Sequence, residues 1–554
     1  MEEPARNNSS STSTFPPGGP LSAPDDTQTL SGSPEKSNQA MTEKDLEQQT
    51  TGPPPLGPVR LALLLFGMFL AGFLASLDIS IVATALPRIS SEFDAQSQMS
   101  WVATAYLLAY TAFQPIYGRF SDIFGRKHMY LTACFLFLIG SVGCGAAPSM
   151  TALIIFRAVQ GFGGSGLFSV VIIMVSDMYE DLETRARYQS LIWLSFAVAG
   201  VTGPLIGGVF VEHVTWRWCF YLGVPLCVLS MALVAWLFKV PFEASDLSQK
   251  MRRVDYWGVV ITVATVLCLL LPLSWGGTTF AWNSAPIITL FCLLPVLLVI
   301  LYLVEKRNPD AIIPPSLFLN RNVALAVLIN GIMGLCFMGS MFYLPLYFQT
   351  VKGTSTTDSG LRLMPNTLAI VSSTIAASFL LKYIRDYRIF LWIGTGIMTI
   401  GIGLFILLDI HTGLASQLIF VLIMGLGQGL IFQNCLLACQ ECAGEEHIAV
   451  ASAACGFVNS IGSAIGVAVC ASAFNNALVS NVAKLSPEIQ TIVHEHRIIE
   501  NMEAISTVPD EIRSQLIYAY ANAFHSVFTV LTPIMGVAFL LSLALRKRDQ
   551  AKKP

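Results

Sequence analysis

Gly118–Lys127, with the sequence GRFSDIFGRK, joins two long apolar runs of the chain, residues 100–117 and 128–146. Each run is close to the length that crosses the hydrocarbon core of a bilayer, so the residues between them are predicted to form a short loop at the membrane surface. Arginine and lysine in short loops favour the cytoplasmic side of a membrane, and this loop contains both. Its glycines and charged residues are Gly118, Arg119, Asp122, Gly125, Arg126 and Lys127.

The composition of the whole chain agrees with a membrane protein. Of its 554 residues, 54% are hydrophobic and 12% are charged, whereas a soluble domain carries about 25% charged residues. Fourteen runs of about 20 apolar residues follow one another between residues 61 and 545. The fold class is therefore predicted to be all-α and polytopic, with fourteen transmembrane helices.

The basic residues predict how these helices are oriented. Loops after even-numbered helices, together with the C-terminal end, hold 20 of the 32 Lys and Arg residues, and loops after odd-numbered helices hold 6. Loops rich in Lys and Arg stay in the cytoplasm. Because an even number of helices brings both termini to one side, both termini are predicted to be cytoplasmic.

Two sets of six helices are expected, since glycine patterns recur at matching places. Gly161 and Gly163 in the fourth helix correspond to Gly425 and Gly427 in the twelfth. Two six-helix halves with a site between them are a common plan for transporters. The predicted organisation is a disordered cytoplasmic tail (1–59), a first bundle (60–238), a linker with helices seven and eight (239–320), a second bundle (321–545) with an external loop (475–521) that holds short surface helices, and a basic cytoplasmic tail (546–554).

Two charged residues inside the membrane are candidates for proton coupling. Asp78 lies eight residues before the outer end of the first helix, and Arg157 lies seven residues after the outer start of the fourth. Because the two helices run in opposite directions, the residues reach nearly the same depth and are expected to pair directly or through water. Asp78 could take up and release a proton, or the two residues could form a static ion pair.

Small and polar residues within the helices give further candidates. Glycines spaced three to four residues apart in the fifth helix allow a neighbouring backbone to approach closely, and the proline among them allows a bend. These residues are Gly200, Gly203, Pro204, Gly207 and Gly208. Polar residues near mid-helix either line a substrate cavity or join helices by hydrogen bonds. They are Tyr110, Gln114, Gln160, Asn330, Gln428 and Asn459.

Four stretches resemble motifs of one family, in the order in which that family carries them. GRFSDIFGRK (118–127) resembles the loop between the second and third helices of major facilitator superfamily transporters. LDISIVATALP (77–87), RAVQGFGG (157–164) and GVTGPLIGG (200–208) are similar to the first-, fourth- and fifth-helix motifs of the fourteen-span drug:proton antiporters. The resemblance covers residues 60–545. It implies that Arg157 serves proton coupling and that residues 118–127 act as a conformational latch, with Asp122 pairing with Arg126 or capping the thirteenth helix near Ala449.

The expected function is therefore proton-coupled efflux of an amphipathic small molecule, such as a toxin, drug or secondary metabolite, across the plasma membrane. An importer with the same architecture, such as a siderophore transporter, is the first alternative, and the vacuolar membrane is an alternative location. An integral membrane enzyme is disfavoured because the seven histidines lie at helix ends or in loops. A P-loop is absent because the chain has no Gly-Lys dipeptide. No cofactor, metal or nucleic acid is expected, and a monomer is expected to be sufficient.

Overall fold

The structure is a computed structural model that describes residues 57–95, 98–179, 181–238, 247–276, 280–444, 447–487, 489–490 and 510–547. Thirteen helices in these ranges are long and apolar enough to cross a membrane. We count α3 as a fourteenth, because it lies among them although tyrosines and Gln114 make it less apolar. The predicted disordered tail, residues 1–59, lies outside the described residues except for its last three positions, and so does the basic tail after Lys547.

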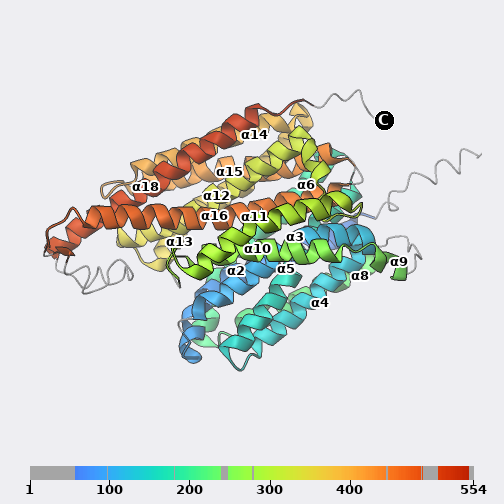
Figure 1. The fold of residues 1–554 in the computed structure, drawn as a ribbon, viewed down its shortest axis with the longest axis horizontal. Coiled ribbons are helices and arrows are strands. Elements are labelled where there is room, and N and C mark those ends of the chain that lie inside the picture. Colours follow the sequence, from blue (N-terminus) through green and yellow to red (C-terminus); the bar gives the residue numbers. More distant parts are fainter. Residues whose placement is uncertain are drawn as a thin grey trace, which may run out of the picture. The chain divides into compact units, whose positions relative to one another are not determined.

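The first bundle contains six membrane helices, one of which is interrupted (Figure 1). α5 packs against α3 and α4, and α2 packs against α6 and α8. α5 lies at the centre of this bundle, since 83% of the residues in its most apolar 18-residue stretch are buried. The helices are α2 (Pro58–Glu92), α3 (Met99–Phe124), α4 (Arg126–Gly145), α5 (Met150–Met178), α6 (Leu182–His213) and the pair α7 (Trp218–Tyr221) and α8 (Gly223–Leu237).

The second bundle repeats the packing of the first. α15 packs against α13 and α14 as α5 does against α3 and α4, and α12 packs against α16 and α18 as α2 does against α6 and α8. The internal repeat predicted from the glycine patterns is thus present in the fold. The helices are α12 (Arg321–Thr350), α13 (Thr356–Ile384), α14 (Tyr387–Leu404) with the short 3₁₀ turn η3 (Phe405–Leu407), α15 (Leu414–Ala443), α16 (Ile448–Val482) and α18 (Asp510–Leu543).

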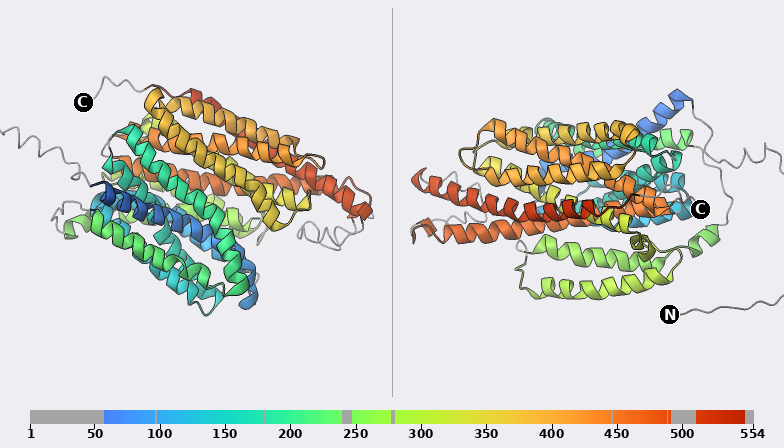
Figure 2. Two further views of the ribbon diagram at one scale, coloured as in Figure 1. Left: turned by 180° about the vertical axis from the view of Figure 1, so that it is seen from behind. Right: turned by 90° about the horizontal axis from the view of Figure 1, so that it is seen from above.

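A pair of helices lies between the bundles in the sequence and along one face of them in space (Figure 2). After the short α9 (Leu247–Arg252), α10 (Tyr256–Trp275) packs against α3 and α16, whereas α11 (Ala285–Arg307) packs mainly against α10. In the most apolar 18-residue stretch of α11, only 6% of the residues are buried. Such an apolar and exposed helix is stable only against lipid. The 3₁₀ helix η2 (Pro315–Leu319) then leads into α12.

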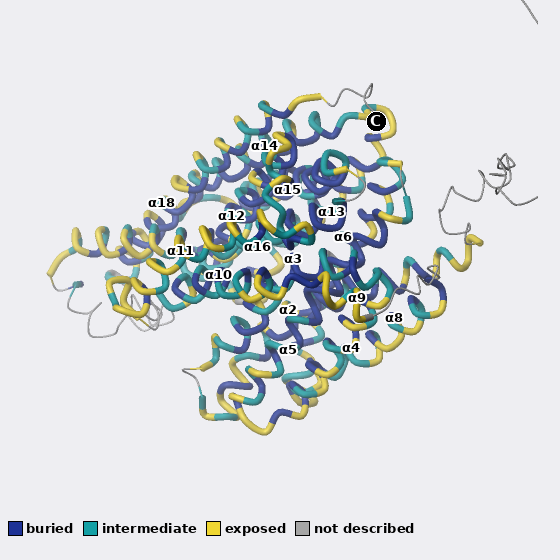
Figure 3. Tube along the Cα trace, turned by 45° about the vertical axis from the view of Figure 1, so that its right-hand side comes forward, coloured by how far each residue is buried: buried dark blue, intermediate teal, exposed yellow. Residues whose placement is uncertain are grey.

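Burial follows this arrangement. Buried segments gather where helices pack against one another, and exposed segments lie at the periphery (Figure 3). The main apolar core extends through both bundles, from Leu64 on α2 to Leu545 after α18. The described residues form no β-strand, and their one isolated bridge joins Gly276 and Phe280.

Two predicted loops are wrong in their extent. Residues 118–124 continue α3, and only Gly125, with φ of 89°, breaks the helix before α4 begins at Arg126. The external loop 475–521 is also shorter than predicted, because α16 continues to Val482 and α18 begins at Asp510. The two helices extend past the rest of the bundle at the end predicted to be external (Figure 1). The two extensions contact each other, since Asn481 Nδ2 donates to the backbone carbonyl of Ala519 at 3.3 Å.

Candidate functional site

Asp78 on α2 and Arg157 on α5 form a buried ion pair. Arg157 Nη1 donates to Asp78 Oδ2 at 2.5 Å, and the side chains are 2% and 5% exposed for Arg157 and Asp78 respectively. Matched depth predicted a pair joined directly or through water, and in the structure the contact is direct. A charge in such a place is stable only with a partner, because an isolated buried ion loses its hydration without compensation.

Gln160 completes a closed network around this pair. Its Oε1 accepts from Arg157 Nη1 at 2.7 Å, and its Nε2 donates to Asp78 Oδ1 at 2.8 Å and to Ser141 Oγ at 2.9 Å. Gln160 was predicted to be a possible cavity residue. In the structure it is 1% exposed and lies with the ion pair, away from the residues that line the described pockets.

Arg157 also has partners other than the carboxylate. Its Nε donates to the carbonyl of Val102 at 3.0 Å, and its guanidinium lies 4.3 Å from the centre of the Tyr106 ring. These contacts require α3 to lie very close to α5. Gly161 permits this, because a Cβ there would collide with the carbonyl oxygen of Tyr106. Gly161, the first glycine of the RAVQGFGG stretch, therefore lets α3 come close enough to place the partners of Arg157.

The charged residues of 118–127 form a second network, at the predicted cytoplasmic ends of α3 and α4. Arg126 donates from Nη1 to Asp122 Oδ1 at 2.5 Å and from Nε to Asp177 Oδ2 at 2.6 Å. The first of the two contacts predicted for Asp122 is thus present. Lys127, also predicted to belong to the latch, is half-buried next to this network.

Arg119 extends this network to the linker. Its guanidinium donates to the side chain of Asp310 and also to the backbone carbonyls of Pro309 and Asp310. Arg253 donates to the same carboxylate, from Nη2 to Oδ1 at 2.9 Å. The hydrogen bond from Arg253, together with the charges of Arg119 and Arg253, holds the pKa of Asp310 below its usual range despite partial burial. Asp310 was not among the residues singled out from the sequence, since a lone aspartate between two helices has no distinctive pattern.

Gly118 lies where the two bundles touch. A Cβ at this position would come within 2.6 Å of Ala453 Cβ and 3.1 Å of the carbonyl oxygen of Ala449, both on α16. The second contact predicted for Asp122, a cap on this helix near Ala449, is not among the described contacts, and Gly118 lies against Ala449 instead. The contact joins the inner end of α3 to the first turns of α16.

The five glycine and proline positions of α6 divide between two faces. Gly203 lies against Ser80 and Ile81 of α2, and Gly207 lies against Thr84 and Ile81. A Cβ at Gly200 or Gly208 would meet nothing within 4 Å. Pro204 lies on the exposed face with them. Close approach therefore depends on Gly203 and Gly207 alone in this conformation.

Hydrogen bonds between the bundles lie between the predicted cytoplasmic side and mid-membrane. Near that side, Gln189 Nε2 donates to Gln440 Oε1 at 3.2 Å, and Gln433 Nε2 donates to Gln189 Oε1 at 3.1 Å. Deeper in, Ser460 Oγ donates to Gln114 Oε1 at 3.1 Å. The bundles are thus joined toward the predicted cytoplasmic side. The three buried glutamines at positions 189, 433 and 440 were not predicted, although amide side chains inside apolar helices are a signal that could have indicated them.

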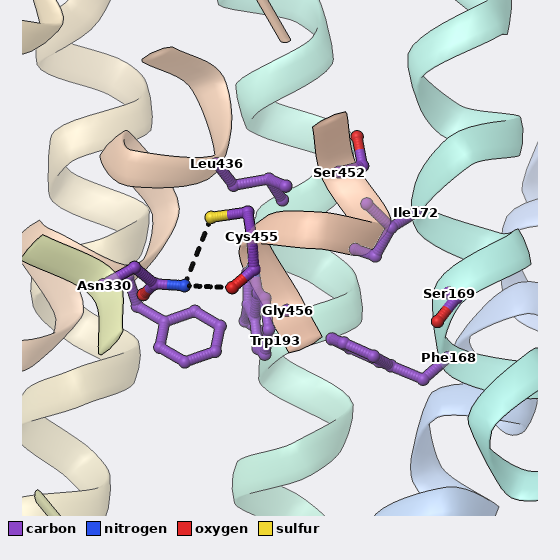
Figure 4. Close-up of a pocket in the computed structure, with 10 residues that line it drawn as sticks. Phe168, Ser169, Ile172, Trp193, Asn330, Leu436, Ser452, Cys455 and Gly456 are labelled. Atoms are coloured by element: carbon purple, nitrogen blue, oxygen red, sulfur yellow. Dashed lines mark hydrogen bonds between the residues drawn. The ribbon is translucent and has the colours of Figure 1, made fainter. Parts of the chain in front are cut away.

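A pocket lies at the junction of the bundles (Figure 4). It has a free volume of about 30 Å³ and is lined from the first bundle by α5 and α6 and from the second by α12, α15 and α16. Of the predicted cavity residues, only Asn330 lines it. The lining residues are Phe168, Ser169, Ile172, Trp193, Asn330, Phe432, Leu436, Ser452, Cys455 and Gly456.

The other predicted cavity residues lie elsewhere. Tyr110 stacks on Tyr106, with ring centres 6.0 Å apart, and Gln114 lies at the crossing of α3 and α16. Asn459 donates to the carbonyl of Asn330 at 2.9 Å, and Gln428 is buried in α15. A larger pocket of about 300 Å³ between α3, α4 and α5 contains none of them. Among the described residues, no group of three His, Cys, Asp or Glu side chains is arranged to hold a metal ion.

Residues 68–467 match the Major Facilitator Superfamily. The chain belongs to this superfamily. Its relatives include an MFS-type efflux pump of Arthroderma benhamiae, which is 31% identical over 94% of this chain and 96% of its own length. The efflux pump dotC of Dothistroma septosporum is 34% identical over 89% and 84%. An aspyridones efflux protein of Neocamarosporium betae is 31% identical over 92% and 91%.

Solved structures of the superfamily share the fold. The human organic anion transporter MFSD10 (TETRAN) aligns with a TM-score of 0.57 at 12% identity, covering 88% of this chain and all of that chain. The proton:xylose symporter XylE aligns with a TM-score of 0.55 at 14% identity, covering 88% and 96%. The superfamily fold expected from the four motifs is confirmed.

Proposed function

We propose that this protein is a proton-coupled efflux transporter that exports an amphipathic small molecule, such as a toxin, drug or secondary metabolite, in exchange for protons. It acts by alternating access, as a monomer in the plasma membrane with both termini in the cytoplasm, and it catalyses no chemical reaction. The relatives named as efflux pumps support export over the alternative of siderophore uptake.

The observation that carries the proposal is the network of Asp78, Arg157 and Gln160. A proton carrier inside a membrane has to be stable in both of its charge states. When Asp78 is ionised, Arg157 balances its charge. When Asp78 is protonated, Arg157 keeps the Gln160 amide oxygen, the Val102 carbonyl and the Tyr106 ring as partners. The site therefore tolerates the arrival and departure of a proton on Asp78.

Residues 118–127 serve as the latch of the transport cycle. Gly118 lets α3 approach α16, and Arg119 attaches the same end of α3 to the linker through Asp310. Together with the glutamine contacts between α6 and α15, these interactions hold the bundles together at the cytoplasmic side. Their release would let the bundles rotate and open the pocket toward the cytoplasm.

The test is proton-driven transport by proteoliposomes that contain Asp78→Asn. Asparagine is nearly isosteric and cannot carry the proton. We expect the variant to lose uptake driven by an imposed pH gradient, yet to retain counterflow exchange, which needs no net proton movement. The assay uses radiolabelled amphipathic compounds. A compound serves as the test substrate only if vesicles with the wild-type protein accumulate it.

Asp358→Asn is the matched control. Asp358 pairs with Arg362 at 2.9 Å, one turn apart on α13, and its side chain is 47% exposed. Removing this exposed charge is expected to leave gradient-driven uptake unchanged. Undiminished gradient-driven uptake by Asp78→Asn would disprove the proton role of Asp78.

A further inference from the structure

Three buried polar atoms in the pocket between the bundles have no hydrogen-bond partner. They are Ser169 Oγ on α5, Trp193 Nε1 on α6 and Asn330 Oδ1 on α12. The side chains of Ser169 and Asn330 are 5% and 2% exposed. Buried polar groups in proteins are nearly always hydrogen-bonded, and each unpaired group costs about 1–3 kcal/mol. Three such atoms around one cavity indicate that a ligand supplies the partners.

The three atoms differ in what they require. Trp193 Nε1 can only donate, Asn330 Oδ1 can only accept, and the Ser169 hydroxyl can do either. Asn330 is held in place, because its Nδ2 already donates to the carbonyl of Cys455 at 2.9 Å. Asn330 and Ser169 lie on opposite sides of the pocket (Figure 4). A ligand that satisfies all of them therefore carries both an acceptor and a donor.

Three aromatic side chains, Phe168, Trp193 and Phe432, line the pocket. The rings of Phe168 and Trp193 meet edge to face, with centres 5.2 Å apart, and those of Trp193 and Phe432 do so at 4.2 Å. Phe168 and Trp193 belong to the first bundle, and Phe432 belongs to the second. Aromatic rings prefer such edge-to-face and offset arrangements with other rings. An aromatic ring of a ligand can thus replace one of these contacts when the bundles separate.

None of the ten lining residues is charged. An ion in this pocket would lose its hydration without gaining a counter-charge, which is unfavourable in a buried site. The lining residues lie about 4–11 residues, or roughly 6–17 Å, from the predicted inner ends of their helices, and thus in the predicted inner half of the membrane. The pocket consequently disfavours anions and cations.

We propose that this pocket recognises uncharged aromatic molecules that carry both a hydrogen-bond acceptor and a hydrogen-bond donor. Trp193 donates to the acceptor, Asn330 accepts from the donor, and Ser169 provides the third bond. The inference rests on the proposed efflux function and specifies its substrate class. With about 30 Å³ of free volume the pocket is contracted here, since binding a benzene ring takes roughly 150 Å³. The ligand enters when the bundles separate along this junction.

Two substitutions each remove one of the three unpaired atoms without removing any hydrogen bond within the described structure. Ser169→Ala deletes the hydroxyl, and Trp193→Phe keeps an aromatic ring while deleting the N–H. Ser165→Ala is the matched control, because Ser165 lies one turn earlier on α5, is equally buried and bonds only to the carbonyl of Phe162 among the contacts described. Neither pocket variant is expected to lower the melting temperature of the purified protein.

Binding is measured by fluorescence polarisation of a hydroxycoumarin added to the purified protein in detergent, at about pH 6 so that its phenol is protonated. Its ring carbonyl is the acceptor and its phenol is the donor. The comparison probes are its methyl ether, which lacks the donor, its carboxylate derivative, which is an anion, and ethidium, which is a cation.

We expect the wild-type protein and Ser165→Ala to bind the hydroxycoumarin alike. Each pocket variant should bind the hydroxycoumarin about five- to tenfold more weakly than the wild-type protein does, because one buried hydrogen bond is lost. The wild-type protein should bind the methyl ether more weakly than the hydroxycoumarin by the same factor, for the same reason. Equal binding by the pocket variants, or preference of the wild-type protein for either charged probe, would overturn the inference. Efflux of a charged dye without binding of hydroxycoumarin would overturn it too, while leaving the proposed efflux function intact.

Discussion

Arg119 and Asp310 are 191 positions apart in the chain, and the guanidinium of Arg119 donates both to the carboxylate and, at 3.1 Å, to the backbone carbonyl of Asp310. Asp310 follows the inserted helices α10 and α11, and Arg119 lies one residue after Gly118, where α3 touches α16. The inserted pair is therefore attached to the first bundle beside its junction with the second.

Replacing Asp310 tests this attachment. Asp310→Asn keeps the backbone contacts but removes the charge that Arg119 and Arg253 share. The side chains of Arg119 and Asp310 are 11% and 19% exposed, so we expect a loss of about 1–2 kcal/mol, seen as a fall of about 2 °C in melting temperature in detergent. Asp386→Asn is the control, since Asp386 pairs only with Arg388, two residues away, among the contacts described. A larger fall in the control would contradict the prediction.

The same contact predicts a dependence on pH. The pKa of Asp310 is lowered in the folded protein, first by the hydrogen bond from Arg253. A carboxylate with a lowered folded pKa stabilises the protein above its unfolded pKa of about 3.9 and loses this effect as the pH falls through the folded value. The difference in melting temperature between the wild-type protein and Asp310→Asn should therefore be constant above about pH 5 and shrink below about pH 4. A difference in melting temperature that grows as the pH falls would have the opposite sign and would contradict the prediction.

Gly203 and Gly200 provide a matched pair on α6. A side chain at Gly203 collides with Ser80 of α2, whereas one at Gly200 meets nothing within 4 Å. Gly203→Leu should lower the stability by about 1–3 kcal/mol or prevent folding, because the packed interface cannot absorb the added volume. Gly200→Leu should keep the wild-type melting temperature. The measurements are expression of monodisperse protein and thermal melting, and equal behaviour of the two variants would refute the close-approach role of Gly203.

Gln189 tests the junction between the bundles. Gln189→Leu leaves the amides of Gln440 and Gln433 without this partner, at a cost of about 1–3 kcal/mol to the joined conformation. We expect faster hydrogen–deuterium exchange, measured by mass spectrometry, at the inner ends of both α6 and α15. In the control Gln417→Leu, the lost bonds are to Arg362 and Thr412 of the second bundle. In Gln417→Leu, faster hydrogen–deuterium exchange should be confined to the predicted outer end of α15. Faster exchange in α6 of this control would argue against a specific junction at Gln189.

Much of the architecture could be predicted because the membrane limits the possibilities. The number of helices follows from runs of apolar residues, and the pairing of Asp78 with Arg157 follows from matched depth and opposite charge. The extent of the helices was less predictable. Helices continue past the apolar runs into polar sequence, as α3 does to Phe124, because water at the membrane surface does not end a helix. Only Gly125, with its positive φ, ends this one.

The order of the residues is sufficient to predict repeated membrane helices and the placing of the Asp78 carboxylate opposite the Arg157 guanidinium. Hydropathy and charge are properties of the residues along the chain, and they act on each helix separately. The folded chain was needed to show that Gln160 joins the ion pair, that Asp310 binds Arg119, and that one pocket is lined by Ser169, Trp193 and Asn330. These relationships depend on how helices far apart in the sequence rotate about their axes to pack, which periodicity along a single, almost uniformly apolar helix does not specify.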